Sequence, residues 1–189
     1  MILTARIDYD YKCLKSYFHK LFDILQEASA EDQIAPLEGQ DIDAVESQAT
    51  YHNFIHFIKP DMLMNIYSLV DFWMKEICNY QKNKNNLNLS YKDVKRNHDL
   101  DAYHKCLTLY AGLDLNAVQI SYKQLDDLRK VRNHFIHRGG HIPSDKNIEK
   151  ELSAISGTKL SGSLIVIDDN FIWNTLEHAK KYLSAAAQA

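Results

Sequence analysis

The chain contains little glycine, proline and cysteine. Its 189 residues include six glycines, three prolines and three cysteines. Because glycine and proline are the residues that most often end helices, their scarcity predicts long helices and a mostly α-helical fold. The cysteines are odd in number and form no Cys-x-x-Cys pair, which argues against a disulfide framework and is typical of reduced thiols in a cytosolic protein. They are Cys13, Cys78 and Cys106.

Long apolar runs and an excess of positive charge are also missing. No stretch approaches the roughly 18 consecutive apolar residues that a membrane span needs, and charged residues from Arg6 onward interrupt the segment where a secretory signal would be apolar. The formal net charge of -3 argues against a protein that grips duplex nucleic acid over its whole surface. With 46% hydrophobic residues, the chain can bury one core. We therefore expect one cytoplasmic domain over residues 1–189, with no membrane partner.

Apolar residues at three- and four-residue spacing predict the helices. Pro60 should end or kink the chain before the most apolar helix, which we expect to be central. Two polar segments separate helices: an acidic connector at about 29–46, and a basic, Asn-rich loop at about 81–96, interpreted as a solvated loop or as an RNA-contacting rim. The predicted helices cover about residues 5–28, 47–58, 62–80, 100–111, 122–138 and 171–187.

Short signals predict how the elements begin and end. Residues 159–163 and 164–167 should form a small β-hairpin, after which Asp168 or Asp169 should cap the last helix. Ser90 should cap a short helix. The helix at 122–138 has a signal at each end: Ser121 and Gln124 fit a capping box, and Gly139-Gly140 fit a C-terminal stop.

The segment Arg132-Asn133-His134-Phe135-Ile136-His137, at the end of that helix, carries the most chemical content. Arg132 falls on the apolar face of the helix, where a charged side chain costs free energy unless it is paired or lines a wet cleft. His137 lies roughly 140° farther around an ideal helix, so the two side chains converge only near the helix end or across a dimer. The apolar face is expected to comprise Leu125, Leu128, Val131, Phe135 and Ile136.

These residue types fit cleavage of RNA through its own 2′-hydroxyl, a reaction that needs a proton donor or acceptor and a fixed positive charge. Histidine is the side chain that most readily exchanges protons near neutral pH, so His137 would act as general acid or base. Arg132 would hold two phosphate oxygens in its planar fork, and Asn133 would orient either residue. The neighbouring cations expected to bind substrate are Arg129, Lys130 and Arg138.

The motif also has ordinary structural explanations. A cation in the last helical turn, such as His137, interacts favourably with the helix dipole. Arg129 and His134 repeat the same spacing without an Asn after the Arg, so spacing alone proves little. Asp71 could contact Arg132, although a structural ion pair is the more common role for such a carboxylate.

A metal site is a weaker prediction. His52 and His56 stand four residues apart, as two metal ligands on a helix would, but no third and fourth ligand is apparent in the sequence nearby. No phosphate-binding Walker loop or dinucleotide-binding fingerprint is present either. We therefore expect neither a metal nor a cofactor.

Residues 125–137 resemble the signature helix of HEPN domains, in which an Arg, often followed by a polar residue, precedes a His after four to six residues. The Arg132-Asn133…His137 pattern carries this resemblance, and the run at 66–71 and the hairpin before the final helix extend it less specifically. It implies a HEPN-like α-helical bundle and a homodimer whose two motif helices form a composite cleft. In catalytic members that cleft cuts RNA without a metal, which makes Arg132 and His137 the active pair and Asn133 their supporting residue.

One position departs from part of that family. HEPN toxins that are paired with a nucleotidyltransferase antitoxin usually have a modified Tyr two places after the motif His, where this chain has Gly139. The resemblance therefore does not predict that form of regulation here.

Two functions follow from the sequence. The first is a homodimeric, metal-independent endoribonuclease acting on tRNA or mRNA, a toxin or phage-defence effector with an antitoxin or regulatory protein as a further partner. The alternative is a non-catalytic HEPN dimerisation or adaptor module that binds a protein partner or RNA, with Arg132 in an interface ion pair. The enzyme requires His137 exposed in a cleft, whereas the adaptor tolerates it buried.

Overall fold

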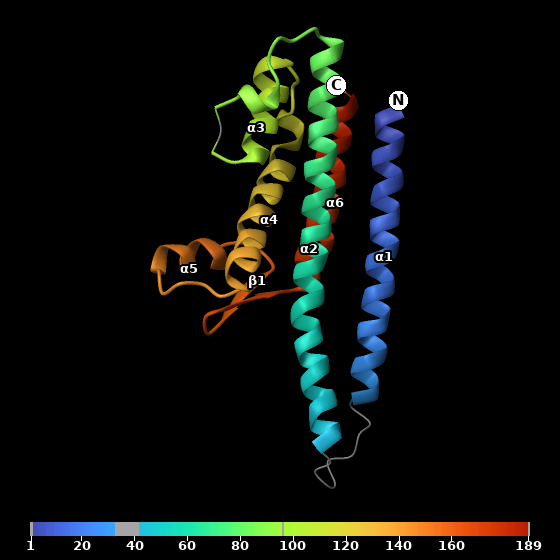
Figure 1. Ribbon diagram of the computed structural model, residues 1–189, viewed down its shortest axis with the longest axis vertical. Helices are drawn as coiled ribbons and strands as arrows, with labels where there is room; N and C mark the ends of the chain where they lie inside the picture. Colours follow the sequence, from blue (N-terminus) through green and yellow to red (C-terminus); the bar gives the residue numbers. More distant parts are fainter. Residues whose placement is uncertain (1, 33–41, 96, 189) are drawn as a thin grey trace.

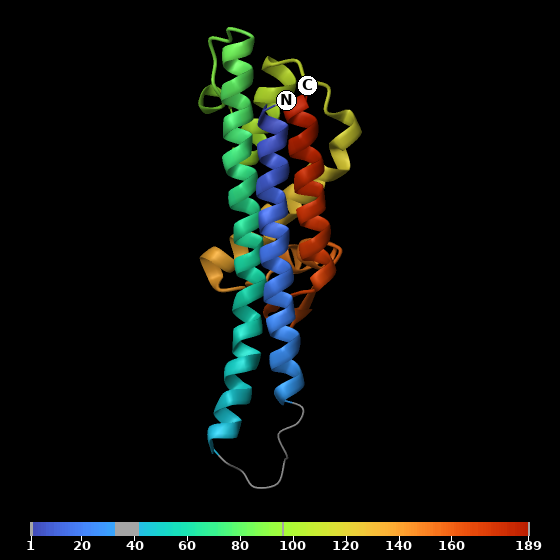
Figure 2. The ribbon, with the colours of Figure 1, turned by 90° about the vertical axis from the view of Figure 1, so that its right-hand side faces the viewer.

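The fold is a bundle of long helices with a small two-stranded hairpin. A computed structural model describes the backbone of residues 2–32, 42–95 and 97–188, and the side chains of residues 2–27, 57–95 and 97–188. The helices α1 (Ile2–Asp32), α2 (Ile42–Lys84) and α6 (Asp169–Gln188) run side by side (Figures 1 and 2). The helix α4 (Gln119–Arg138) packs on α2 and α6. The prediction of a mostly helical fold is confirmed.

The core forms where the apolar faces of these helices meet. On α2 the buried residues recur every three or four positions, so a single face packs against α1, α4 and α6. Ion pairs join α1 to α6 at the surface, with Lys15 2.8 Å from Glu177 and Lys180 2.9 Å from Asp8. The buried face of α2 includes Met62, Leu63, Ile66, Val70, Met74 and Ile77.

Three boundaries predicted in the region of helix α2 are wrong. It runs without interruption through Pro60, which removes one backbone donor, so the two helices predicted at 47–58 and 62–80 are one. Buried Ile58 and Met62 on either side of Pro60 pack into the same core, and this packing offsets the local cost. The acidic connector predicted at about 29–46 is helical at both ends, because α1 extends to Asp32 and α2 begins at Ile42. Its residues 33–41 lie outside the described residues. The predicted basic loop begins only after Lys84.

Shorter elements connect α2 to α4. Ser90 caps the 3-10 helix η1 (Tyr91–Asp93) in a capping box with Asp93, which confirms its predicted role. The helix predicted at 100–111 is α3 (Asp99–Lys105) followed by the π-helical turn η2 (Cys106–Tyr110). The 3-10 helix η3 (Asn116–Val118) then leads into α4.

The start of α4 differs from the prediction, and its end agrees. Ser121 and Gln124 do not form a capping box, because α4 begins at Gln119 and both side chains bond to α6 instead. At the other end Gly139 adopts a left-handed φ of 58°, and its amide bonds to the carbonyl of Phe135, as expected for a C-terminal stop.

The hairpin and the helix α5 contact the C-terminal half of α4 and the turn after it. The strands β1 (Thr158–Ser161) and β2 (Leu164–Ile167) pair antiparallel, as predicted, and the amide of Ile165 bonds to the carbonyl of Gly140. Asp168 then caps α6 by accepting from the amide of Phe171. The helix α5 (Lys146–Ser153), which Asp145 caps, was not predicted. Within the part of the chain that the structure describes, no helix is both long and apolar enough to cross a membrane.

Candidate functional site

The predicted site lies on α4, which stands between α5 and α2 in Figure 1. Its buried residues include Leu125, Leu128 and Val131, as expected. The predicted apolar face is too wide, however, because Ile136 is 45% exposed. An apolar residue at the exposed end of the motif helix is therefore available to another surface.

Six residues of α4 make up a surface that we call the α4 stripe. On an ideal helix they fall within about 100° of arc, and none of them is buried. Tyr67 of α2 flanks the stripe on one side, and Glu151 of α5 flanks it on the other, since these residues contact Arg132 and Lys130 respectively. The stripe consists of Tyr122, Asp126, Arg129, Asn133, Ile136 and His137.

Arg132 is half-buried at the edge of the stripe. Its guanidinium carbon lies 4.7 Å from the centre of the Tyr67 ring, and Nη1 donates to Oδ1 of Asn133 at 3.2 Å. Its Nε is buried with no hydrogen-bond partner, and no carboxylate among the described side chains forms an ion pair with it. A desolvated cation with spare donors is costly on its own, so this site favours binding of an anion.

Asp71 does not pair with Arg132. Its carboxylate lies 2.5 Å from Lys75 Nζ and accepts from the hydroxyl of Tyr103 at 2.8 Å. Burial, together with that hydrogen bond, raises the pKa of Tyr103. Asp71 therefore forms a structural ion pair, the more common of the two roles considered for it. The residue of α2 that contacts Arg132 is instead Tyr67, one turn before Asp71.

His137 is exposed in the last turn of α4, as the enzyme hypothesis requires. No hydrogen bond between described residues joins it to Arg132 or Asn133. A single chain therefore brings Arg132 and Asn133 together, while His137 stands on the far side of the stripe. Ile136 lies between these two edges, at the position that a second surface would cover.

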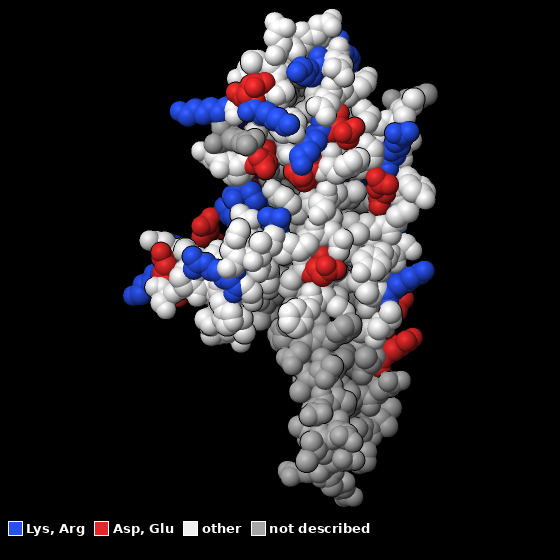
Figure 3. Space-filling model, in the orientation of Figure 1, with Lys and Arg blue, Asp and Glu red and all other residues white. Residues whose placement is uncertain are grey.

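The three predicted substrate-binding cations differ from one another. Arg129 donates from Nε to Asp126 at 2.8 Å, and Lys130 lies 2.9 Å from Glu151. Burial raises the pKa of Asp126, but the ion pairs with Arg129 and Lys130 lower it by a larger amount, so this pKa lies below its usual range. Arg138 is exposed and takes part in no ion pair among the described residues. Figure 3 shows basic and acidic side chains interspersed over this face rather than one continuous basic surface.

The sequence does not predict the environment of two residues at this site, Tyr67 and His134. Tyr67 belongs to the run at 66–71 noted in the sequence, but nothing in that run indicates that its ring supports a cation from another helix. His134 is partly buried with Nδ1 unpartnered, and burial together with the nearby Arg138 lowers its pKa. Among the described residues, no three His, Cys, Asp or Glu side chains are grouped to hold a metal. The side chains of His52 and His56 lie outside the described part.

Comparison of the chain with models of protein families, with curated proteins and with solved structures finds no match.

Four partly buried histidines predict how stability depends on pH. Burial lowers the pKa of each, so the unfolded chain binds more protons as the pH falls below about 6.5. Stability present above that pH should be lost as the pH falls toward the folded-state pKa values. These residues are His98, His104, His134 and His178.

Urea unfolding at pH 7.5, 6.5 and 5.5 measures this dependence, and the midpoint should fall across the series. His178→Asn keeps a polar partner for Ser121, which lies 3.0 Å from Nδ1 of His178, but removes one titrating group. Its midpoint should fall less steeply with acid. A midpoint that stays constant or rises between pH 7.5 and 5.5 would contradict the role given to the buried histidines.

Proposed function

We propose that this chain is a metal-independent endoribonuclease of the HEPN type, with a site formed where the α4 helices of two copies meet. The observation that carries the proposal is Arg132, a half-buried guanidinium whose buried Nε has no partner among the described residues, at the edge of the same helical stripe that exposes His137. These are the groups that a phosphodiester undergoing transfer requires: a fixed cation and a side chain that exchanges protons near neutral pH.

The reaction proposed is attack of a ribose 2′-oxygen on the adjacent phosphorus. A His137 imidazole takes the proton of the 2′-hydroxyl, the new oxygen–phosphorus bond forms, and the bond to the 5′-oxygen of the next nucleotide breaks. A protonated His137 returns a proton to that leaving oxygen. The products are a 2′,3′-cyclic phosphate and a free 5′-hydroxyl. Arg132 stabilises the negative charge on the crowded phosphorane oxygens, and Asn133 holds its guanidinium.

A second copy supplies what one chain lacks. His137 and Arg132 lie about 140° apart around an ideal helix and share no hydrogen bond within the described chain. Two α4 stripes facing each other across a two-fold axis would place two of each residue around one cleft. The exposed Ile136 provides apolar contact at the centre of that interface. As the resemblance implies, such an enzyme would act in the cytoplasm as a toxin or phage-defence effector held in check by another protein.

One observation favours the alternative, an adaptor. A hollow of about 360 Å³ adjoins the end of α4, between Pro60 of α2 and strand β2. Phe57, at 74% exposed, Leu164 and Val166 line it and present apolar surface to solvent. Exposed apolar surface of this kind marks protein-binding sites. A partner bound there would contact the motif helix without any need for chemistry at His137.

Cleavage by matched histidine variants tests the proposal. Purified wild-type protein, His137→Ala and His141→Ala are incubated with total cellular RNA and with tRNA in EDTA. His141 is exposed nearby but lies outside the α4 stripe, so it serves as the control. We expect His137→Ala to lose about a hundredfold or more of the rate, the usual contribution of one acid-base residue, and His141→Ala to keep it. Wild-type protein that leaves both RNAs uncut would support the adaptor instead, and equal cleavage by His137→Ala and wild type would remove His137 from the site.

A further inference from the structure

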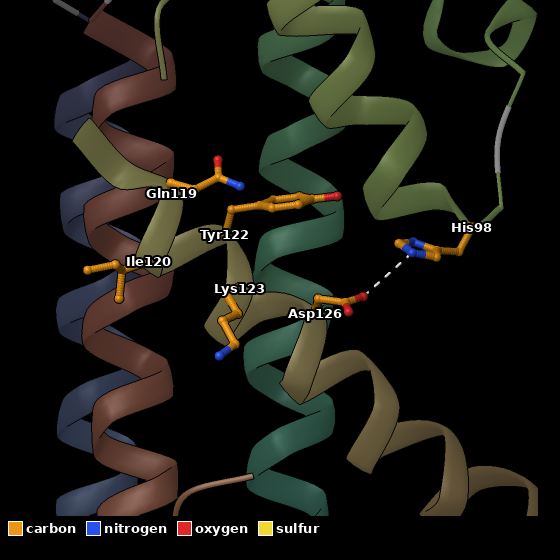
Figure 4. A pocket seen from close by; sticks show the side chains of 6 residues that line it. All are labelled: His98, Gln119, Ile120, Tyr122, Lys123 and Asp126. Carbon is orange, nitrogen blue, oxygen red and sulfur yellow. Dashed lines mark ion pairs between the residues drawn. The ribbon is translucent and has the colours of Figure 1, made fainter. Parts of the chain in front are cut away.

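We propose that a hollow at the N-terminal end of the α4 stripe binds a nucleobase of single-stranded RNA. This inference rests on the proposed function, because it concerns how the same helix would recognise its substrate. The hollow has a volume of about 360 Å³, within the range of small-molecule sites. Figure 4 shows its lining, which comes from α4 and from the residue preceding α3: His98, Gln119, Ile120, Tyr122, Lys123 and Asp126.

An aromatic platform forms one wall. The Tyr122 ring stacks on His104, with ring centres 4.0 Å apart and planes 22° apart. His104 is itself fixed, since its Nδ1 lies 2.7 Å from the hydroxyl of Tyr182. Burial lowers the pKa of His104 and raises that of Tyr122 to about 12, so both rings are neutral near pH 7. A rigid, neutral aromatic surface beside a hollow suits stacking of a planar base.

Polar groups stand beside that platform at fixed orientations. His98 Nδ1 accepts from the amide of Asp101 at 3.1 Å, which leaves the proton of the neutral ring on Nε2. That Nε2 faces Asp126 Oδ1 at 3.5 Å, the pair marked by the dashed line in Figure 4. Asp126 is held ionised by Arg129, and a carboxylate has lone pairs to accept further hydrogen bonds. It can therefore accept from an amino group on the edge of a base.

A free cation completes the site. Lys123 is exposed, lines the hollow and takes part in no ion pair among the described residues. Lys130, two turns farther along the same side of α4, is by contrast paired with Glu151. Gln119 is exposed beside it and carries both a donor and an acceptor. An aromatic wall, an ionised acceptor and an unpaired ammonium together match a base with its phosphate better than they match an apolar side chain of a protein partner.

The position of the hollow relates it to the proposed cleavage site. Tyr122 lies ten residues before Arg132, or about 15 Å along the helix axis at about 1.5 Å per residue. Tyr122, Asp126 and Arg129 belong to the same stripe as Asn133 and His137. A single strand lying along the stripe would place one base in the hollow while another part of the strand reaches His137. The hollow would thus contribute affinity and base preference, and Arg132 and His137 would carry out the cleavage.

Binding of short RNA to an uncleaving protein tests this proposal. All proteins carry His137→Ala and are titrated in EDTA with fluorescent single-stranded 12-mers of A, C or U. Tyr122→Leu removes the ring and Tyr122→Phe, the matched control, keeps it. If one base stacks on the ring, Tyr122→Leu should raise the Kd by roughly tenfold to a hundredfold for at least one 12-mer. The Kd of Tyr122→Phe should stay within about twofold of that of the protein with Tyr122. Unchanged affinity in folded Tyr122→Leu overturns the proposal.

Lys123→Gln provides a second variant, because the exposed Lys123 side chain makes no ion pair with any residue that the structure describes. It should weaken binding and lower the slope of log Kd against log salt by about one phosphate contact. An unchanged slope would count against the site even if Tyr122→Leu does not fold. AMP, CMP and UMP form another arm, monitored by NMR signals of the Tyr122 and His98 rings. Mononucleotide binding without any effect of Tyr122→Leu on the 12-mers would overturn RNA as the occupant.

This test is separate from that of the proposed function. Wild-type protein that fails to cut RNA, combined with Tyr122-dependent binding of the 12-mers, would reject the ribonuclease and keep the nucleobase site. Cleavage that depends on His137, combined with affinity independent of Tyr122 and Lys123, would keep the ribonuclease and reject the nucleobase site.

Discussion

Arg132→Lys is expected to fold like the wild type and to lose RNA cleavage by roughly a hundredfold or more. The guanidinium packs over the Tyr67 ring and presents a planar fork, whereas an ammonium is a point charge that cannot hold two phosphate oxygens at once. Removing one donor that stabilises transition-state charge typically costs about a hundredfold to a thousandfold in rate. Initial rates of cleavage of a defined RNA in EDTA measure the loss.

Arg129→Lys is the matched control for that prediction. Arg129 lies one turn earlier on the same stripe, but its Nε is committed to Asp126 at 2.8 Å, a contact that Lys can partly replace. We expect its rate to stay within a few fold of the wild type. Thermal unfolding of both variants should stay close to that of the wild type. Full activity in Arg132→Lys would remove Arg132 from the site.

Ile136→Glu is expected to convert a dimer to a monomer and to abolish cleavage while the fold remains. Ile136 is 45% exposed, so the free chain should tolerate a carboxylate there at little cost. In a two-fold interface between α4 stripes, each new carboxylate would lose water and approach its own copy. The variant leaves Arg132, Asn133 and His137 intact, so it separates assembly from chemistry.

Sedimentation and cleavage rates of the same preparations check this prediction. Ile24→Glu is the control, because Ile24 is also about half exposed, at 52%, but lies on α1, away from α4. It should remain dimeric and active. A monomeric Ile136→Glu protein that still cuts RNA at the wild-type rate would show that the site is complete within one chain.

The helices and the hairpin follow from local patterns in the sequence, and the errors arise where tertiary packing overrides them. Gly139 ends α4 because only a residue that tolerates a left-handed backbone fits there. Pro60, by contrast, does not end α2, because the core holds the helix on both sides of it. Ser121 fits a capping box by spacing, but its hydroxyl bonds to His178, which is far away in the sequence.

The candidate site is predictable only in part for the same reason. Spacing places Arg132 and His137 on one helix and implies a half-buried Arg, as found. It cannot show that Asp71 is taken by Lys75 and Tyr103, or that Tyr67 supports the guanidinium, because these contacts depend on how α2 packs on α4. The hollow at Tyr122 is likewise formed by two segments that are separate in the sequence, α4 and the start of α3.

The chemical ends of the RNA products test the central claim most directly. Wild-type protein is incubated with tRNA in excess EDTA, and the new ends are identified by enzymatic labelling and mass spectrometry. Attack by the 2′-hydroxyl, assisted by His137 and Arg132, predicts 2′,3′-cyclic phosphates and 5′-hydroxyls. Products with 5′-phosphates and 3′-hydroxyls, or cleavage that stops in EDTA, would contradict a metal-free mechanism on α4.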